Sequence, residues 1–298
     1  CDCCVAYCQQ TTSLTTEVAL MNTATHTSTH TMIHEKDLHT TTMRSAGELI
    51  KRSLINTRRL PSAFFPTLAM PIFNMVSFSG TFFALTKLPN FPTDRSVNWF
   101  MPLGLAMGSA FSGVGLGFSL IRDLENGFYD RLRMSPTSRV SLIVGPVLAT
   151  WIRVTLVSVV VFIAGFLLGA RPTAGLLSYV CALAAALGIS TIGAGWGLGL
   201  AYRFQDMRGA AIMQLSIFLT MFMSTAQVPL NVMTGWLHTV ARLNPITNIF
   251  RLSRSGWVNQ TDPGYMSWSN AYGGLLAIGV LSVLSLIFAL QSLKKIDN

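Results

Sequence analysis

Residues 111–145 read FSGVGLGFSLIRDLENGFYDRLRMSPTSRVSLIVG. A glycine-rich apolar stretch leads directly into a short charged block, and a second apolar stretch follows it. The apolar flanks are typical of membrane spans, so we expect the charged block to be a short amphipathic helix at the bilayer surface. A membrane protein that receives mechanical work from a soluble partner needs such an element, because it gives the partner something rigid to push on.

The composition of the whole chain also indicates a membrane protein. Hydrophobic residues make up 51% of the chain and charged residues only 11%, whereas a soluble domain usually has about a quarter charged residues. A helix needs about 20 apolar residues to cross the hydrocarbon core. Six stretches meet this need, at 64–86, 99–121, 144–169, 174–201, 210–230 and 271–293. We therefore predict an all-α integral membrane protein with six transmembrane helices.

The distribution of Lys and Arg predicts the orientation of these spans. With the N-terminus inside, the inner segments carry fourteen basic residues and the outer segments six. We therefore expect a multi-pass protein of the cell (plasma) inner membrane with both termini in the cytoplasm. The net charge of +9 follows from this bias, so no nucleic-acid partner is implied. Arg153 is expected in the cytoplasmic third of its span, where it either snorkels to the headgroups or belongs to a polar pathway.

The N-terminal segments differ in kind from the spans. Residues 1–42 are rich in Thr and show no helical or strand period, which predicts a disordered tail without chemistry. Its cysteines and histidines have a spacing that matches no zinc motif, so no metal site is predicted. Residues 43–60 carry apolar and basic residues on opposite sides of a helix, which predicts an amphipathic helix on the inner leaflet. Residues 61–298 then form the transmembrane domain.

Glycines recur four residues apart in the second and fourth spans. Examples are the pairs Gly113 and Gly117, and Gly193 and Gly197. Small residues at this spacing let helices approach closely. The simplest interpretation is ordinary packing within one subunit, and the alternative is that these faces slide during a transport cycle.

A partly apolar segment follows the fifth span on the predicted outer side. It reads VPLNVMTGWLHTVARLNPITNIFRLSRSGWV at residues 228–258, and two prolines interrupt it. This pattern predicts two short re-entrant helices that dip into the outer leaflet, shielded by protein. Such a segment either closes the outer mouth of a pathway or is an interfacial loop. The candidate gate residues are Pro229, Trp236, Asn244 and Pro245.

The chain lacks the residues of an energy source. It contains no GxxxxGK[ST] loop for a nucleotide. No Asp or Glu lies within a predicted span, which argues against a proton antiporter, an intramembrane protease and a metal-dependent lipid enzyme. We therefore expect no catalytic residue and no cofactor in this chain. Energy for transport would enter from a partner at residues 122–139.

Three segments resemble, in order, the membrane subunit of type-2 ABC exporters, and most closely their daunorubicin/doxorubicin-resistance (DrrB/DrrC-like) branch. The segment KRSLINTRRLPSAFFPTLAMPIF at 51–73 resembles the connecting helix and first span. The segment 122–149 resembles the acidic-Gly coupling segment, and 223–256 resembles a stretch with Val-Pro-Leu, Gly-Trp-Leu and Asn-Pro. The resemblance implies that coupling to the ATPase uses Arg122, Glu125, Gly127, Arg131, Leu132, Pro136 and Arg139.

The resemblance also implies partners and cargo. Two permease subunits, identical or different, would pair in the membrane, and each would dock one copy of a separately encoded ABC ATPase. ATP and Mg would bind that ATPase. The cytoplasmic coupling helix and the connecting helix would transmit its motion, and the cargo would be a hydrophobic drug, a lipid or a glycolipid. The alternatives are a polysaccharide exporter permease and a self-standing secondary transporter.

Overall fold

The structure is a computed structural model that describes residues 47, 51, 55, 61–87, 91, 93–127, 139–230, 232–258 and 268–296. The chain divides into two units, 1–45 and 46–298, and all described residues belong to the second unit. The tail at 1–42 therefore lies outside the described residues. Of the predicted connecting helix only residues 47, 51 and 55 are described, and these three are helical.

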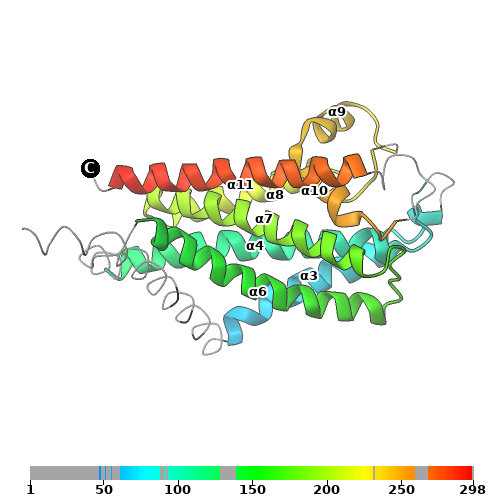
Figure 1. Cartoon of the computed structure of the whole chain (residues 1–298), viewed down its shortest axis with the longest axis horizontal. Helices are drawn as coiled ribbons and strands as arrows, with labels where there is room; N and C mark the ends of the chain where they lie inside the picture. Colours follow the sequence, from blue (N-terminus) through cyan, green and yellow to red (C-terminus); the bar gives the residue numbers. More distant parts are fainter. Residues whose placement is uncertain are drawn as a thin grey trace, which may run out of the picture. The chain divides into compact units, whose positions relative to one another are not determined.

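The described residues form helices and connecting turns, without a strand among them (Figure 1). The helices are α3 (Pro61–Thr81), the short 3-10 helix η1 (Leu85–Lys87), α4 (Ser96–Glu125), α6 (Arg139–Leu167), α7 (Leu176–Phe204), α8 (Arg208–Phe222), α9 (Trp236–Leu243), α10 (Pro245–Arg254) and α11 (Trp268–Ile296). The predicted all-helical fold is confirmed for the described residues.

Each of the six predicted spans coincides with a helix, but the helices differ in length. Within the part of the chain that the structure describes, four segments are long and apolar enough to cross a membrane, namely Ser96–Glu125, Leu142–Leu167, Leu176–Phe204 and Ala271–Lys295. Helix α8 has 15 residues and ends at Phe222 instead of the predicted 230. At about 1.5 Å per residue it measures about 22 Å, which is shorter than the hydrocarbon core. Six full spans therefore remain a prediction.

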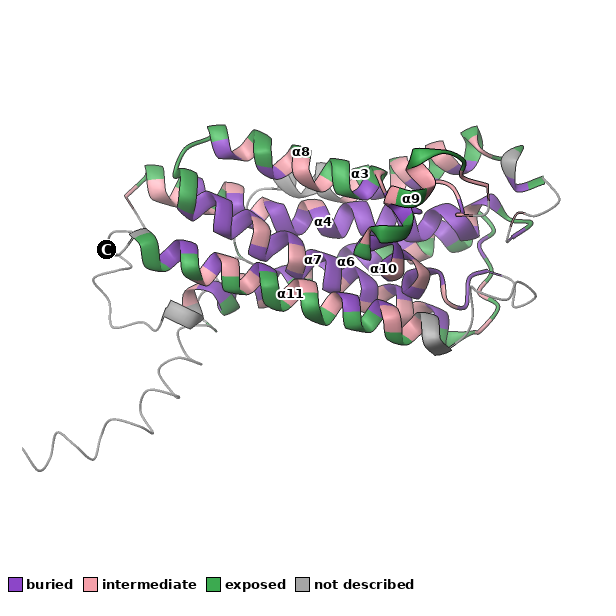
Figure 2. Ribbon diagram, turned by 90° about the horizontal axis from the view of Figure 1, so that it is seen from above, coloured by how far each residue is buried: buried purple, intermediate pink, exposed green. Residues whose placement is uncertain are grey.

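Helix α7 is the central element of the described helices. It packs against α4, α6, α8, α10 and α11, and Figure 2 shows long buried stretches on both α4 and α7. Its buried residues are mostly Gly, Ala and Ser, which let neighbouring backbones come close. The short helices α9 and α10 lie at one end of the bundle, and the C-terminus of α11 lies at the other end (Figure 1).

The glycine pairs form helix contacts inside this one chain. A Cβ added to Gly113 would lie 2.8 Å from the backbone nitrogen of Ala194, and one added to Gly117 would lie 2.6 Å from the carbonyl oxygen of Gly197. Gly195 meets α11 in the same way, with its added Cβ 2.7 Å from the carbonyl carbon of Ser285. These glycines therefore pack helices together within one subunit, and sliding of the same faces during a transport cycle stays a prediction.

Arg153 lies in the middle of α6, since Arg139 and Leu167 are each fourteen residues away. It is partly buried. Its predicted place in the cytoplasmic third of a membrane span, and the choice between snorkelling and a polar pathway, stay predictions.

Candidate functional site

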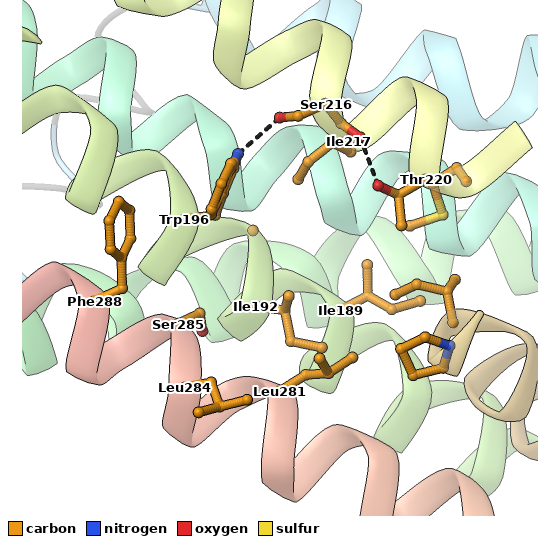
Figure 3. A pocket seen from close by; sticks show the side chains of 14 residues that line it. Ile189, Ile192, Trp196, Ser216, Ile217, Thr220, Leu281, Leu284, Ser285 and Phe288 are labelled. Carbon is orange, nitrogen blue, oxygen red and sulfur yellow. Dashed lines mark hydrogen bonds between the residues drawn. The ribbon is translucent and has the colours of Figure 1, made fainter. Parts of the chain in front are cut away.

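An apolar cleft of about 440 Å³ lies between α8 and α11, and α7 forms its floor (Figure 3). The lining residues come from four helices: Ile189, Ile192, Gly193 and Trp196 of α7; Ser216, Ile217, Thr220 and Met221 of α8; Pro245 and Ile246 of α10; and Leu281, Leu284, Ser285 and Phe288 of α11. The volume lies in the range of about 300–1,000 Å³ that is usual for small-molecule pockets.

Helical periodicity explains how these residues come to face one space. The α7 residues Ile189, Ile192 and Trp196 are three and four positions apart, as are Leu281, Leu284 and Phe288 of α11. Residues at these spacings share one face of a helix. Both α8 and α11 pack against α7, so their apolar stripes converge over its floor.

The polar side chains of the cleft bond to the protein itself. The indole Nε1–H of Trp196 donates to Ser216 Oγ at 2.7 Å, and Thr220 Oγ1 donates to the carbonyl of Ser216 at 2.7 Å (Figure 3). Ser285 Oγ donates to the carbonyl of Ser282 at 3.0 Å. No charged residue lines the cleft. Because burying a charge or an unsatisfied polar group is costly, this lining favours neutral, apolar ligands.

Asn244, one of the predicted gate residues, connects the end of α8 to the start of α10. Its Nδ2 donates to the carbonyls of Thr220 at 2.8 Å and Met223 at 3.0 Å. Its Oδ1 accepts from the backbone nitrogen of Ile246 at 3.0 Å, as an N-cap residue does. The wall of the cleft that α8 forms is thus held by Trp196 near its middle and by Asn244 at its end.

The four predicted gate residues do not form one cluster. Pro245 follows Asn244 as the first residue of α10 and lines the cleft. Trp236 begins α9, is 69% exposed and is not part of the lining. Pro229 is buried in the connection between α8 and α9, also away from the lining. The predicted pair of short helices is confirmed as α9 and α10, whereas their gating role stays a prediction.

Arg254, the last residue of α10, is buried and connects α10 to the turn after α8 and to α4. Its side chain is 2% exposed, and its Nη1 and Nη2 donate to the carbonyls of Thr225 and Ala226, each at 2.5 Å. Its guanidinium carbon lies 3.6 Å from the centre of the Trp99 ring. Arg254 is one of the six basic residues that the charge bias places in outer segments. The structure instead buries it, because backbone carbonyls and an aromatic face replace its water.

Asn98 makes a second polar connection at this end. Its Nδ2 donates to the carbonyls of Arg171 and Trp257, both at 2.9 Å, and its Oδ1 accepts from the backbone nitrogen of Arg171 at 3.1 Å. One side chain of α4 therefore binds the turn between α6 and α7 to the segment after α10. These contacts connect α4, the turn before α7 and the segment after α10 at the end of the bundle where α10 lies.

The described coupling residues lie at the opposite end, around the connection from α4 to α6. Arg122 and Glu125 are exposed in the last turn of α4, and Arg139 is the first residue of α6. Gly127 has a φ of +64° and its nitrogen donates to the carbonyl of Leu124 at 3.1 Å, a helix-ending geometry that favours glycine. The remaining predicted coupling residues, Arg131, Leu132 and Pro136, lie outside the described residues.

The cleft itself was not predicted from the sequence. The available signal was the spacing of Ile189, Ile192 and Trp196 and of Leu281, Leu284 and Phe288. Apolar stripes of this kind also occur on helix faces that meet lipid or pack in a core, so spacing alone does not mark a cavity. For metals, the described residues contain no group of three or more His, Cys, Asp or Glu side chains placed to hold an ion.

The sequence is similar to one known protein family and to several known proteins. The sequence profile of the ABC-2 type transporter family matches residues 45–257. The chain is 29% identical over 206 residues to the protein named as transport permease ycf38 of Porphyra purpurea, covering 67% of this chain and 69% of that protein. It is 29% identical over 226 residues to the ycf38 protein of Cyanophora paradoxa, covering 70% and 74%. It is 24% identical over 210 residues to the daunorubicin resistance ABC transporter permease protein DrrB1 of Streptomyces coeruleorubidus, covering 68% and 71%.

Proposed function

This chain belongs to the ABC-2 type transporter family, and on that premise we propose that it is the permease subunit of an ATP-driven exporter for hydrophobic compounds. The observation that carries the proposal is the uncharged cleft between α8 and α11. A space of that size with an apolar lining suits a lipophilic cargo. The cargo class would be hydrophobic drugs, lipids or glycolipids, moved out of the cytoplasm or the inner leaflet.

The source of energy would be a separate chain. Permeases of this family work with ABC ATPase subunits. We expect two ATPase copies, with ATP and Mg bound to them, and a second permease subunit, identical or different. The ATPase would dock at the end that exposes Arg122 and Glu125. That end would face the cytoplasm together with both termini, as the bias in Lys and Arg predicts.

The relatives support the cargo class only in part. The name of DrrB1 assigns that protein to daunorubicin resistance, while the name of the ycf38 proteins states transport without a cargo. The lining itself disfavours polysaccharides, because the hydroxyls of Ser216, Thr220 and Ser285 bond within the protein. A sugar chain would need many polar partners there.

Reconstitution tests the proposal. The permease is captured in mild detergent, and the ATPase that copurifies with it is identified and placed with it in liposomes. We expect a fluorescent lipophilic probe to move only when the ATPase is present and ATP is hydrolysed. A non-hydrolysable ATP analogue serves as the control. Transport that needs no ATPase and follows an imposed proton gradient would contradict the proposal and support a secondary transporter.

A further inference from the structure

We propose that the cleft between α8 and α11 binds the acyl chain of a membrane lipid, which enters sideways from the bilayer. This inference rests on the proposed function in one respect, since it requires α7, α8 and α11 to lie in a membrane. It adds a site and a ligand: a lipid-chain site within a single subunit, floored by Trp196 and Ile192 of α7.

The chemistry of the lining points to a hydrocarbon ligand. Most of the side chains are aliphatic or aromatic, and the three hydroxyls already donate within the chain. The Trp196 indole N–H is also committed, to Ser216 at 2.7 Å. A ligand that required hydrogen bonds or an opposite charge would lose them on entering. A saturated chain requires neither, so it enters without that penalty.

The rim of the cleft carries exposed leucine side chains on both α8 and α11. Leu284, which lines the cleft on α11, is 57% exposed. On α8, the neighbouring Leu215 and Leu219 are 68% and 52% exposed. Exposed leucines on both sides of an apolar opening would be unfavourable in water and are expected against lipid. A chain can therefore pass from the bilayer into the cleft without crossing a polar barrier.

The dimensions suit part of one lipid chain. The lining extends from Ile189 to Trp196 and from Leu281 to Phe288, and seven residues of helix rise about 10 Å. The rings of Trp196 and Phe288 stack at 5.4 Å and form one end. Pro245 and Ile246 of α10 form the other end. The cleft is open along its rim and limited in length by these two ends, so it has room for one segment of an acyl chain.

Photolabelling of the purified permease without any ATPase tests the inference. The probe is a phosphatidylcholine that carries a diazirine near the end of one acyl chain, and the labelled positions are mapped by mass spectrometry. We expect adducts at Ile192 and Phe288. Leu284→Trp, which fills the cleft from its rim, should reduce them at least fivefold. Leu276→Trp is the matched control, because Leu276 lies on the same helix, is 69% exposed and does not line the cleft; it should leave them unchanged.

Other outcomes would overturn the inference. These are adducts spread evenly over the exposed face of α6, adducts unaffected by Leu284→Trp, or equal labelling when the diazirine is on the headgroup. A second filling variant, Leu281→Phe, covers the case in which Leu284→Trp does not fold. Failure of this inference is distinguishable from failure of the proposed function: ATP-driven export without cleft labelling removes only the lipid site, and cleft labelling without ATP-driven export removes only the exporter.

Discussion

Replacing Arg254 by Lys tests whether the buried guanidinium holds the α10 end of the bundle together. Arg254 donates to the carbonyls of Thr225 and Ala226 at 2.5 Å and stacks over the Trp99 ring at 3.6 Å. These partners belong to the turn after α8 and to the start of α4. A lysine keeps the positive charge but lacks the planar fork that reaches both carbonyls while stacking on a ring.

The expected cost follows from the contacts that lysine cannot replace. Losing one hydrogen bond to a charged donor costs about 1.5–3 kcal/mol, and a desolvated cation–π contact contributes up to about 2 kcal/mol, part of which a lysine retains. We therefore expect Arg254→Lys to lower the free energy of unfolding by about 3 kcal/mol. Domains of 150–250 residues lose about 2–4 °C per kcal/mol, so the apparent melting temperature should fall by about 6–12 °C.

The assay is thermal unfolding of the purified permease in detergent, followed by tryptophan fluorescence. Arg251→Lys is the matched control on the same helix, because Arg251 is only partly buried and its Nη1 reaches Asn248 Oδ1 at 3.5 Å. The control should change the stability by less than about 0.5 kcal/mol. Equal melting temperatures for the two variants would refute the role assigned to Arg254.

Three further predictions concern helix packing, coupling and the α8 wall. Gly113→Ala should destabilise the permease by about 1–3 kcal/mol, because its Cβ would meet the α7 backbone; Gly115→Ala, with open space around it, should be neutral or stabilising by up to about 1 kcal/mol in the same melting assay. Glu125→Ala and Gly127→Pro should abolish ATP-driven export while membrane insertion stays normal, and normal export by both would contradict the coupling assignment. Asn244→Ala should lower the free energy of unfolding by about 1–2 kcal/mol and speed hydrogen exchange in the last turn of α8, because it removes the N-cap of α10 and the donor to the carbonyls of Thr220 and Met223; unchanged exchange would contradict the role of Asn244 in holding the end of α8.

Local patterns predicted the helices well. The stretch 144–169 became α6, and 271–293 became α11, because a long apolar run in a chain of low charge has few alternatives to a membrane helix. The prolines at 229 and 245 correctly indicated that the segment after the fifth span breaks into short helices. These are properties of neighbouring residues, so they can be read without knowing any long-range contact.

The end of α8 was predicted less well, for a reason that lies elsewhere in the chain. The apolar run continues to residue 230, yet the helix ends at Phe222. The side chain of Asn244, more than twenty positions further on, donates hydrogen bonds to the carbonyls of Thr220 and Met223. A helix whose last carbonyls find a partner can end there, and no local signal announces a partner so far along the chain.

The sequence by itself determined that this chain forms apolar helices with charged segments between them, because hydropathy and charge are properties of neighbouring residues. Only the tertiary structure decided which apolar stripe lines a cavity and which charged side chain is buried. Leu284 and Leu276 are alike in sequence, but one lines the cleft and the other does not. The physical reason is that a cavity and a buried arginine are defined by the distances between helices, and those depend on contacts such as Gly195 with Ser285 and Arg254 with Trp99.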